Sequence, residues 1–332
     1  MAGSRTIIGG LALLCAASGL GLGCGSQFEL PPQPPPGRIP EPGTYNLWTV
    51  WPVSAPGDLA VYGLYLFLIE EQSRVTAYYS TRLAPEPVPM VSDFEGLEAP
   101  ARIALAKRDS LFVVVADSVQ MQVKIYYWLG GEPLYSFHDS LWQRFSGLAA
   151  DAQLHIYVAD AERDTVQAYD RWGRRLRVVT DYGTGFGYVI DPHGLAHNGE
   201  MLLVTDTGKN MIQRLEPDTS NVSALPGAIG EEEDLLLAPQ DVASDRYGEY
   251  IYVADTGQHR VLKFQTTGAF QDTVYSETKI ALDPPIRNPR FLTSEDAVQF
   301  YDETLGAWVD FRTVYVSDPE QERVVLFKLA SQ

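Results

Sequence analysis

Short apolar runs alternate with tight polar turns along most of the chain. In residues 250–264, Y-I-Y-V-A-D-T-G-Q-H-R-V-L-K-F, two apolar runs of strand length flank a polar turn. Related copies occur at residues 66–79, 112–126, 156–169, 202–215 and 314–327. Runs of this length, rich in β-branched and aromatic residues and bounded by turn residues, predict pairs of β-strands.

An acidic residue ends the first apolar run of every copy. It is glutamate in the first copy, Glu70, and aspartate in the others: Asp117, Asp160, Asp206, Asp255 and Asp318. A β-branched residue follows each aspartate six positions later. Because a carboxylate at a strand end can accept backbone N–H bonds two residues on, we interpret these acids as structural turn residues and not as metal ligands.

A further apolar segment precedes each turn and completes a repeating unit. Proline opens it at residues 56–60, 100–104, 192–196, 239–243 and 289–293, and residues 145–149 fill the same place without proline. Fourth strands are expected near residues 88–91, 133–137, 175–179, 224–229 and 271–275. A repeat of about 40–50 residues with strand patterning is typical of a propeller blade.

One small sheet cannot bury both of its faces, whereas six sheets in a ring cover one another. The pattern therefore predicts an all-β, six-bladed β-propeller with four-stranded blades over residues 44–332. The repeats resemble those of the NHL-repeat family of β-propellers over residues 56–332. V-A-D-T-G-Q-H-R-V at 253–261 matches the family's typical wording most closely.

A strand-like segment, Y-N-L-W-T-V-W at residues 45–51, comes before the first complete unit. The last unit stops after its third strand, at residues 325–327. We expect residues 45–51 to supply the missing fourth strand of the last blade, because this closes the ring and removes an exposed edge.

The first 23 residues are typical of a secretory signal peptide. Arg5 is their only charge, and the apolar run that follows it is short for a membrane-spanning helix. L-G-L-G-C at residues 20–24 resembles a bacterial lipoprotein signal, which implies that Cys24 carries a lipid. The alternative is a secreted protein with an ordinary cleaved signal. Residues 24–43 are rich in proline and predict a stiff tether.

These features predict an exported protein, anchored by lipid to a membrane of the cell envelope and facing away from the cytoplasm. Cys15 lies in the signal, so the mature chain has no internal disulfide and its core must stabilise it.

The charge argues against one class of partner. The formal net charge is −18, and no cluster of Lys and Arg is available to neutralise phosphates, so a nucleic-acid partner is not expected. We interpret the acidic run at residues 231–234 as a solvated loop. The chain has no paired-cysteine metal signature, H-E-x-x-H, phosphate loop or G-x-S-x-G motif.

Polar residues at the starts of the inner strands are expected to surround the mouth of the central channel. They are Asp58, Arg102, His193, Gln240, Asp241 and Arg290. P-H-G-L-A at 192–196 resembles an inner-strand segment of the peptidyl-hydroxyglycine lyase, a propeller enzyme with a three-histidine zinc. Only His193 of the five histidines lies at an inner-strand start, so we expect no such zinc. Asp58 and Asp241 alone are too few to argue for calcium, and no cofactor is expected.

The sequence thus predicts a binding or scaffold module that contacts a protein, peptide or glycan at the channel mouth. The alternative is a hydrolase or lyase at the axis that uses His193 with Asp58, Asp241 or Arg290. The sequence does not identify the partner.

Overall fold

The computed structural model describes residues 44–217, 236–245, 247–295, 300–302, 307–309 and 312–329. The signal at 1–23, Cys24 with its tether at 24–43 and the acidic run at 231–234 lie outside these residues. Within the described part, no helix has the length and apolar character needed to cross a membrane.

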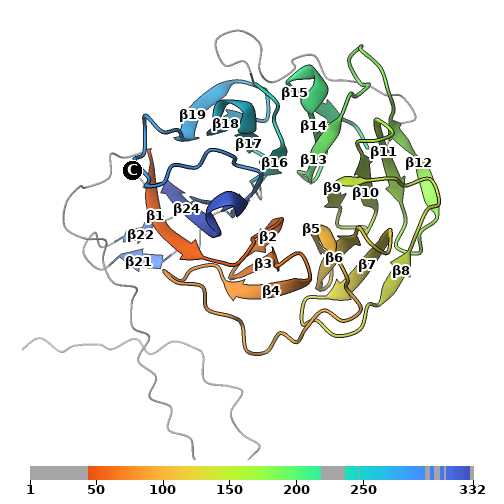
Figure 1. Ribbon diagram of the computed structural model, residues 1–332, viewed down its shortest axis with the longest axis horizontal. Coiled ribbons are helices and arrows are strands. Elements are labelled where there is room, and N and C mark those ends of the chain that lie inside the picture. Colours follow the sequence, from red (N-terminus) through yellow and green to blue (C-terminus); the bar gives the residue numbers. More distant parts are fainter. Residues whose placement is uncertain are drawn as a thin grey trace, which may run out of the picture. The chain divides into compact units, whose positions relative to one another are not determined.

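The described residues form a ring of six small antiparallel sheets, as predicted (Figure 1). The first three blades are β2 (Leu59–Tyr62), β3 (Tyr65–Glu70) and β4 (Arg74–Tyr79); β5 (Pro100–Lys107), β6 (Leu111–Asp117), β7 (Gln122–Tyr127) and β8 (Tyr135–Phe137); and β9 (Phe145–Ala150), β10 (Ile156–Asp160), β11 (Thr165–Tyr169) and β12 (Arg175–Thr180).

The second half of the ring follows the same plan. Its blades are β13 (Pro192–His197), β14 (Leu202–Asp206) and β15 (Met211–Leu215); β16 (Asp241–Ser244), β17 (Tyr250–Asp255), β18 (Arg260–Gln265) and β19 (Phe270–Tyr275); and β20 (Phe291–Glu295), β23 (Arg312–Asp318), β24 (Arg323–Leu329) and β1 (Tyr45–Pro52). A separate hairpin, β21 (Phe300–Asp302) and β22 (Ala307–Val309), lies in the sequence between β20 and β23.

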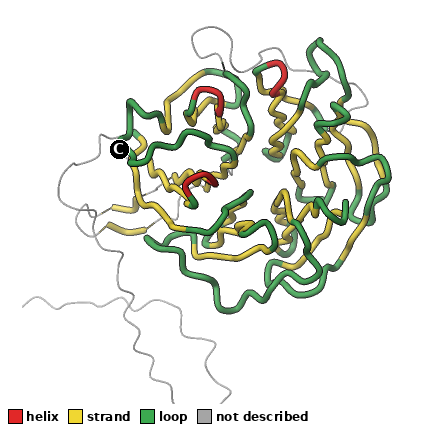
Figure 2. Tube along the Cα trace, in the orientation of Figure 1, coloured by secondary structure: helices red, strands yellow, loops and turns green. Residues whose placement is uncertain are grey.

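The expected fourth strands are present as β8, β12 and β19. In the first blade, the fourth position is a single bridge between Tyr78 and Pro87. The segment expected for the fourth blade, 224–229, lies outside the described residues. Single 3-10 turns, drawn in red in Figure 2, are the helical elements of the described residues; they are Thr207–Lys209, Thr256–Gln258 and Pro319–Gln321.

The ring is closed by the N-terminal strand, as predicted. Each inner strand contacts the inner strand of the next blade, and β20 of the last blade contacts β2 of the first. Strand β1 pairs antiparallel with β24, from Tyr45 opposite Leu329 to Pro52 opposite Arg323. Tyr45 and Trp51 are buried there.

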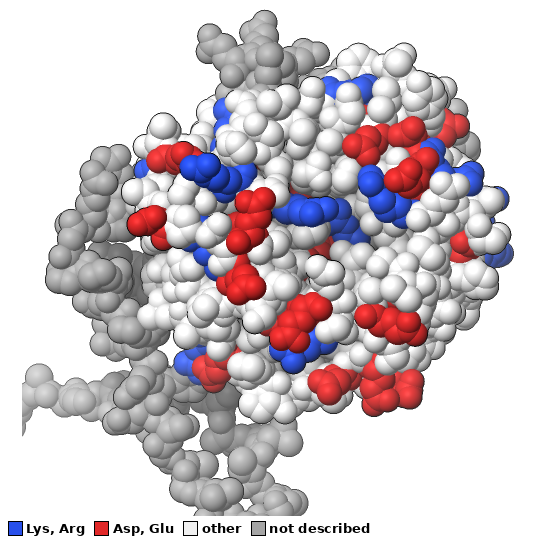
Figure 3. Space-filling view, viewed as in Figure 1, with Lys and Arg blue, Asp and Glu red and all other residues white. Residues whose placement is uncertain are grey.

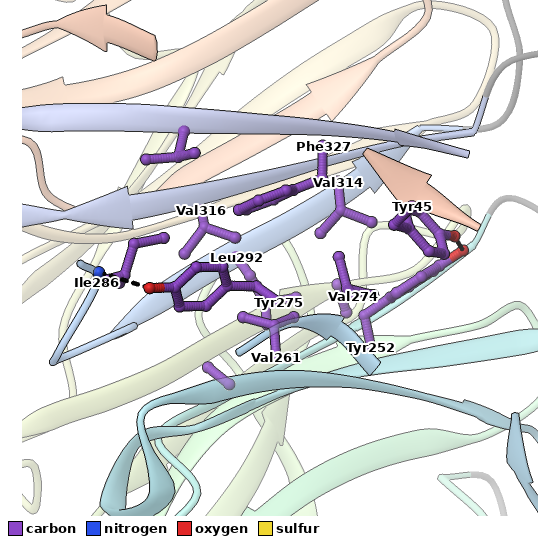
Figure 4. Close-up of a cluster of buried hydrophobic side chains, with 13 residues drawn as sticks. Tyr45, Tyr252, Val261, Val274, Tyr275, Ile286, Leu292, Val314, Val316 and Phe327 are labelled. Carbon is purple, nitrogen blue, oxygen red and sulfur yellow. Dashed lines mark hydrogen bonds between the residues drawn. The ribbon is translucent and has the colours of Figure 1, made fainter. Parts of the chain in front are cut away.

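Both faces of the sheets are covered by neighbouring blades, which explains the continuous apolar runs. In β17, Tyr252 and Ala254 pack against the sixth blade, whereas Ile251 and Val253 pack in the cluster shared with the fourth. Figure 4 shows the first of these clusters, in which side chains of the fifth blade meet Phe327 of the sixth. Alternating side chains therefore enter two different cores.

The turn acids are buried and bond to backbone amides. Asp117 accepts N–H bonds from Val119 (3.2 Å) and Gln120 (3.1 Å) in its own turn. It also accepts them from Glu98 (2.7 Å) and Ala99 (3.3 Å), which lead into the inner strand of the same blade. Each turn acid of the middle four blades bonds to its own entry loop, at Gln143 and Arg144 for Asp160, Ile190 for Asp206 and Leu237 for Asp255. The acids thus attach the strand end to the chain that enters the blade.

Hydroxyl groups make a second recurring bond, between neighbouring blades. Thr207 and Thr256 each donate at 2.6 Å to the carbonyl of the proline that opens the next inner segment, Pro239 and Pro289. Ser317 of the last blade donates at 3.2 Å to the carbonyl of Pro56, which lies next to the first blade.

Candidate functional site

The six inner strands bring equivalent residues together at the axis. The third position of each inner segment is Asp58, Arg102, Gly147, Gly194, Asp241 or Phe291. A Cβ at Gly147 would overlap with the carbonyl oxygen of His193, and one at Gly194 would overlap with the Asp241 carboxyl. The strands therefore approach closely at this level, and we call Asp58, Arg102, Asp241 and Phe291 the axial layer.

Each acid of the axial layer holds the inner strand of the next blade. Asp58 Oδ2 accepts the N–H of Ile103 at 3.0 Å, and Asp241 Oδ2 accepts the N–H of Leu292 at 2.8 Å. Inner strands are edge strands, so these N–H groups would otherwise be left facing the channel.

Burial changes the ionisation of both acids. It raises the pKa of Asp241 to about 8, helped by repulsion from Asp58 and opposed by the charge of Arg102. Burial also raises the pKa of Asp58, again opposed by Arg102. Because the two carboxyl groups act on each other, the protonation of one affects that of the other.

Arg102 is the buried cation of the layer. The residue is only 6% exposed, and its guanidinium lies over the ring of Phe291, 4.6 Å from the ring centroid. Its Nη1 is buried and finds no hydrogen-bond partner among the described residues. An unpaired buried donor is costly, so this group is available for a ligand.

A cavity of about 380 Å3 lies on one side of the axial layer. Asp58, Arg102 and Asp241 line it where it begins, and its walls follow the inner strands toward their C-terminal ends. Small side chains form part of the wall at the fifth position of five inner segments, namely Ala60, Ala104, Ala149, Ala196 and Ala243.

The other predicted site residues lie outside the wall of this cavity. His193, Gln240 and Arg290 are at the second position of their segments and do not line it. The structure thus separates the predicted set into two parts. Asp58, Arg102 and Asp241 belong to the cavity, whereas the other three belong to the mouth on the side where the strands begin.

Two arginines and His193 lie together at this mouth. His193 Nε2 and Arg144 Nη2 each lie 3.2 Å from Asp191 Oδ1. Burial lowers the pKa of His193 to about 4; Asp191 opposes this, and the charges of Arg102 and Arg144 contribute to it. Arg290 is exposed overall, but partial burial of its guanidinium and the charges of the same two arginines lower the pKa of Arg290. We call Arg144, Arg290 and His193 the mouth cluster; the charge of the buried Arg102 in the axial layer also acts on His193 and Arg290.

Figure 3 shows basic side chains near the middle of this face, with acidic side chains around them. Sequence reasoning missed Arg144, which directly precedes the one inner segment without an opening proline. Its position just before an inner strand was the sequence signal that could have identified it as a mouth residue. Within the described residues, no set of three His, Cys, Asp or Glu side chains is arranged to hold a metal ion.

No protein-family model matches the chain, and no curated protein matches it. Among solved structures, a chain of a nidogen/laminin complex is similar with a TM-score of 0.55 and 18% identity, over 68% of this chain and 82% of that chain. A streptogramin B lyase is similar with a TM-score of 0.55 and 12% identity, over 85% of this chain and 96% of that one. At these identities the likeness shows a shared propeller fold, so the function has to be argued from the site.

Proposed function

We propose that this protein is an NHL-type propeller, exported and lipid-anchored through Cys24, that binds a polypeptide partner at its mouth cluster. The observation that carries the proposal is the grouping of the exposed Arg144 and Arg290 at the channel mouth of a chain whose net charge is −18. A local positive site on an acidic protein selects for negatively charged groups.

The chemistry of the cluster favours carboxylates. Guanidinium groups bind carboxylates through paired hydrogen bonds. Arg290 is exposed, and Arg144 is about half exposed with its guanidinium 3.6 Å from Glu162. An acidic side chain or a C-terminal carboxylate of a partner can replace such exposed pairings at little cost, because surface ion pairs are weak. The nidogen propeller, solved in a complex with laminin, supports a polypeptide partner by analogy of fold alone.

Capture of peptides on the immobilised protein tests this function. Glutamate-containing peptides are compared with glutamine-matched peptides, using wild type and the double variant Arg144→Gln/Arg290→Gln. Arg108→Gln is the matched control, since Arg108 is a solvent-exposed arginine that follows the far end of β5. We expect binding of the acidic peptides by wild type and the control, weakened by the double variant and by salt. Equal binding by all three proteins, or binding of glycans alone, would overturn the proposal.

The membrane anchor is tested separately. Labelling cells with a radioactive fatty acid should mark the wild-type protein, and Cys24→Ser should abolish the label and release the protein from membranes. A labelled Cys24→Ser variant would contradict lipidation at this residue.

A further inference from the structure

We propose that the axial cavity binds a small zwitterion of the free amino-acid type. Its carboxylate is bound by Arg102 and its ammonium group by Asp58 and Asp241. The cavity lies on one side of the axial layer, and the exposed residues Arg144 and Arg290 lie on the other. The zwitterion site therefore does not depend on the polypeptide partner proposed above.

Arg102 supplies the anion-binding half of the site. Its side chain lines the cavity and is almost entirely buried, yet Nη1 donates no hydrogen bond within the described residues. Phe291 packs on the guanidinium face at 4.6 Å, which fixes the plane of the group while leaving its edge for an acceptor. A carboxylate is the acceptor that best matches this edge.

The two aspartates supply the cation-binding half. Each carboxyl accepts a backbone N–H of the following blade, Ile103 for Asp58 and Leu292 for Asp241, and this fixes its orientation. A carboxylate has about four lone-pair sites, so acceptor capacity remains on both groups. The acids also repel each other. An ammonium group bound by both would relieve that repulsion while using the free acceptors.

The cavity suits a small molecule and not a folded partner. Its volume of about 380 Å3 is within the usual range of small-ligand sites. The axial layer forms one end of it, and the lining reaches the strand ends at Tyr62, Lys107 and Ser294, so entry is from that side. Leu195 and Ala196 of the wall offer apolar surface to the remainder of the ligand.

Ligands with a single charge fit this arrangement less well. A lone cation would meet the positive charge of Arg102 and would leave Nη1 unpaired. A lone anion would leave the free acceptor sites of Asp58 and Asp241 unpaired. A molecule that carries both charges pairs with all three side chains, which is the reason for choosing a zwitterion over a metal ion or a simple acid.

Isothermal titration of the purified full-length protein tests the proposal. The twenty free amino acids are screened first, and the best binder is compared with its N-acetyl derivative and its carboxamide, with acetate and with calcium chloride. We expect one site per chain and binding at least tenfold weaker for both blocked derivatives. Arg102→Gln and Asp241→Asn should each weaken binding at least tenfold. Arg82→Gln, which changes a solvent-exposed arginine that does not line the cavity, should leave the binding unchanged.

A second variant guards against a folding defect in the charge variants. Ala196→Leu enlarges a residue of the cavity wall, which also packs against the apolar cluster of the fourth and fifth blades, without altering any charged group, and circular dichroism would confirm its fold. It should reduce binding as well. The proposal is overturned if no amino acid binds, if the blocked derivatives bind equally well, if the three cavity variants bind as wild type does, or if calcium or acetate alone binds with the same dependence on these variants.

Discussion

The hydroxyl oxygens of Tyr45 and Tyr252 lie 2.9 Å apart, although 207 residues separate them in the sequence. Their rings meet edge to face with centroids 6.3 Å apart. The N-terminal strand therefore pairs with β24 in the last blade and also contacts the fifth blade. Closure of the ring depends on side chains from three distant parts of the chain.

We expect Trp51→Ala in the closing strand to lower the free energy of unfolding by about 3–5 kcal/mol, the usual cost of removing a fully buried large aromatic side chain. Deleting residues 45–51 should cost more, since it also exposes the edge of β24. Urea denaturation measures both. Leu47→Ala, at a residue 38% exposed in the same strand, is the control and should cost much less. A deletion variant as stable as wild type would refute the closure.

The turn acids should contribute more to the free energy of unfolding than ordinary surface acids do. Asp117 accepts four backbone N–H bonds. Bonds to a charged group contribute about 1.5–3 kcal/mol each and do not add fully, so Asp117→Ala should cost at least about 3 kcal/mol. Asp109→Ala, at a side chain 98% exposed, should change stability by less than about 0.5 kcal/mol. Thermal and chemical unfolding would reveal the difference, and equal stabilities would contradict it.

Stability should depend on pH through Asp241. Its pKa is about 8 in the folded protein and 3.8 for the exposed group, so between these two pH values only the folded state holds the proton. The resulting stabilisation is complete below about pH 4 and is lost as the pH rises to about 8. Asp241→Asn should flatten this part of the profile. Urea midpoints at several pH values measure it, and an unchanged slope in the variant would be evidence against the raised pKa.

The contribution of His193 to stability should change with pH in the opposite direction to that of Asp241. Its pKa is about 4 in the folded protein and 6.5 for the exposed group, so the imidazole is neutral at pH 5 when the protein is folded but charged when it is unfolded. Its contribution to stability is present above pH 6.5 and is lost as the pH falls toward 4. NMR titration of the imidazole measures the folded value directly. Arg144→Gln should raise this pKa and Asp191→Asn should lower it further, and a shift in the reverse direction would contradict the geometry.

The fold could be predicted because the sequence signals that specify it are local and recur in every blade. Each blade carries its own turn acid and inner segment, and the alternation in β17 follows from two cores on either side of one sheet. The first blade departs from the pattern. Its fourth position is a single bridge at Pro87, because proline has no backbone N–H to extend a ladder.

The site could be predicted only in part, because it is assembled by ring closure. The pattern identified Asp58 and Asp241, but their mutual repulsion depends on two blades that are far apart in the sequence. From the pattern alone, the second and third positions of the inner segments were expected to form one ring around the channel mouth. The structure separates them at the axial layer, since His193 and Arg290 lie outside the cavity wall.

The pairing of β1 with β24 also constrains the order of events during synthesis. A ribosome makes β1 before every blade and β24 after nearly all of them. The nascent chain must therefore keep an apolar strand with Tyr45 and Trp51 unpaired until the last hairpin emerges. Premature pairing with another strand edge is the hazard of this arrangement, so a nascent chain would benefit from a chaperone that holds its leading strand.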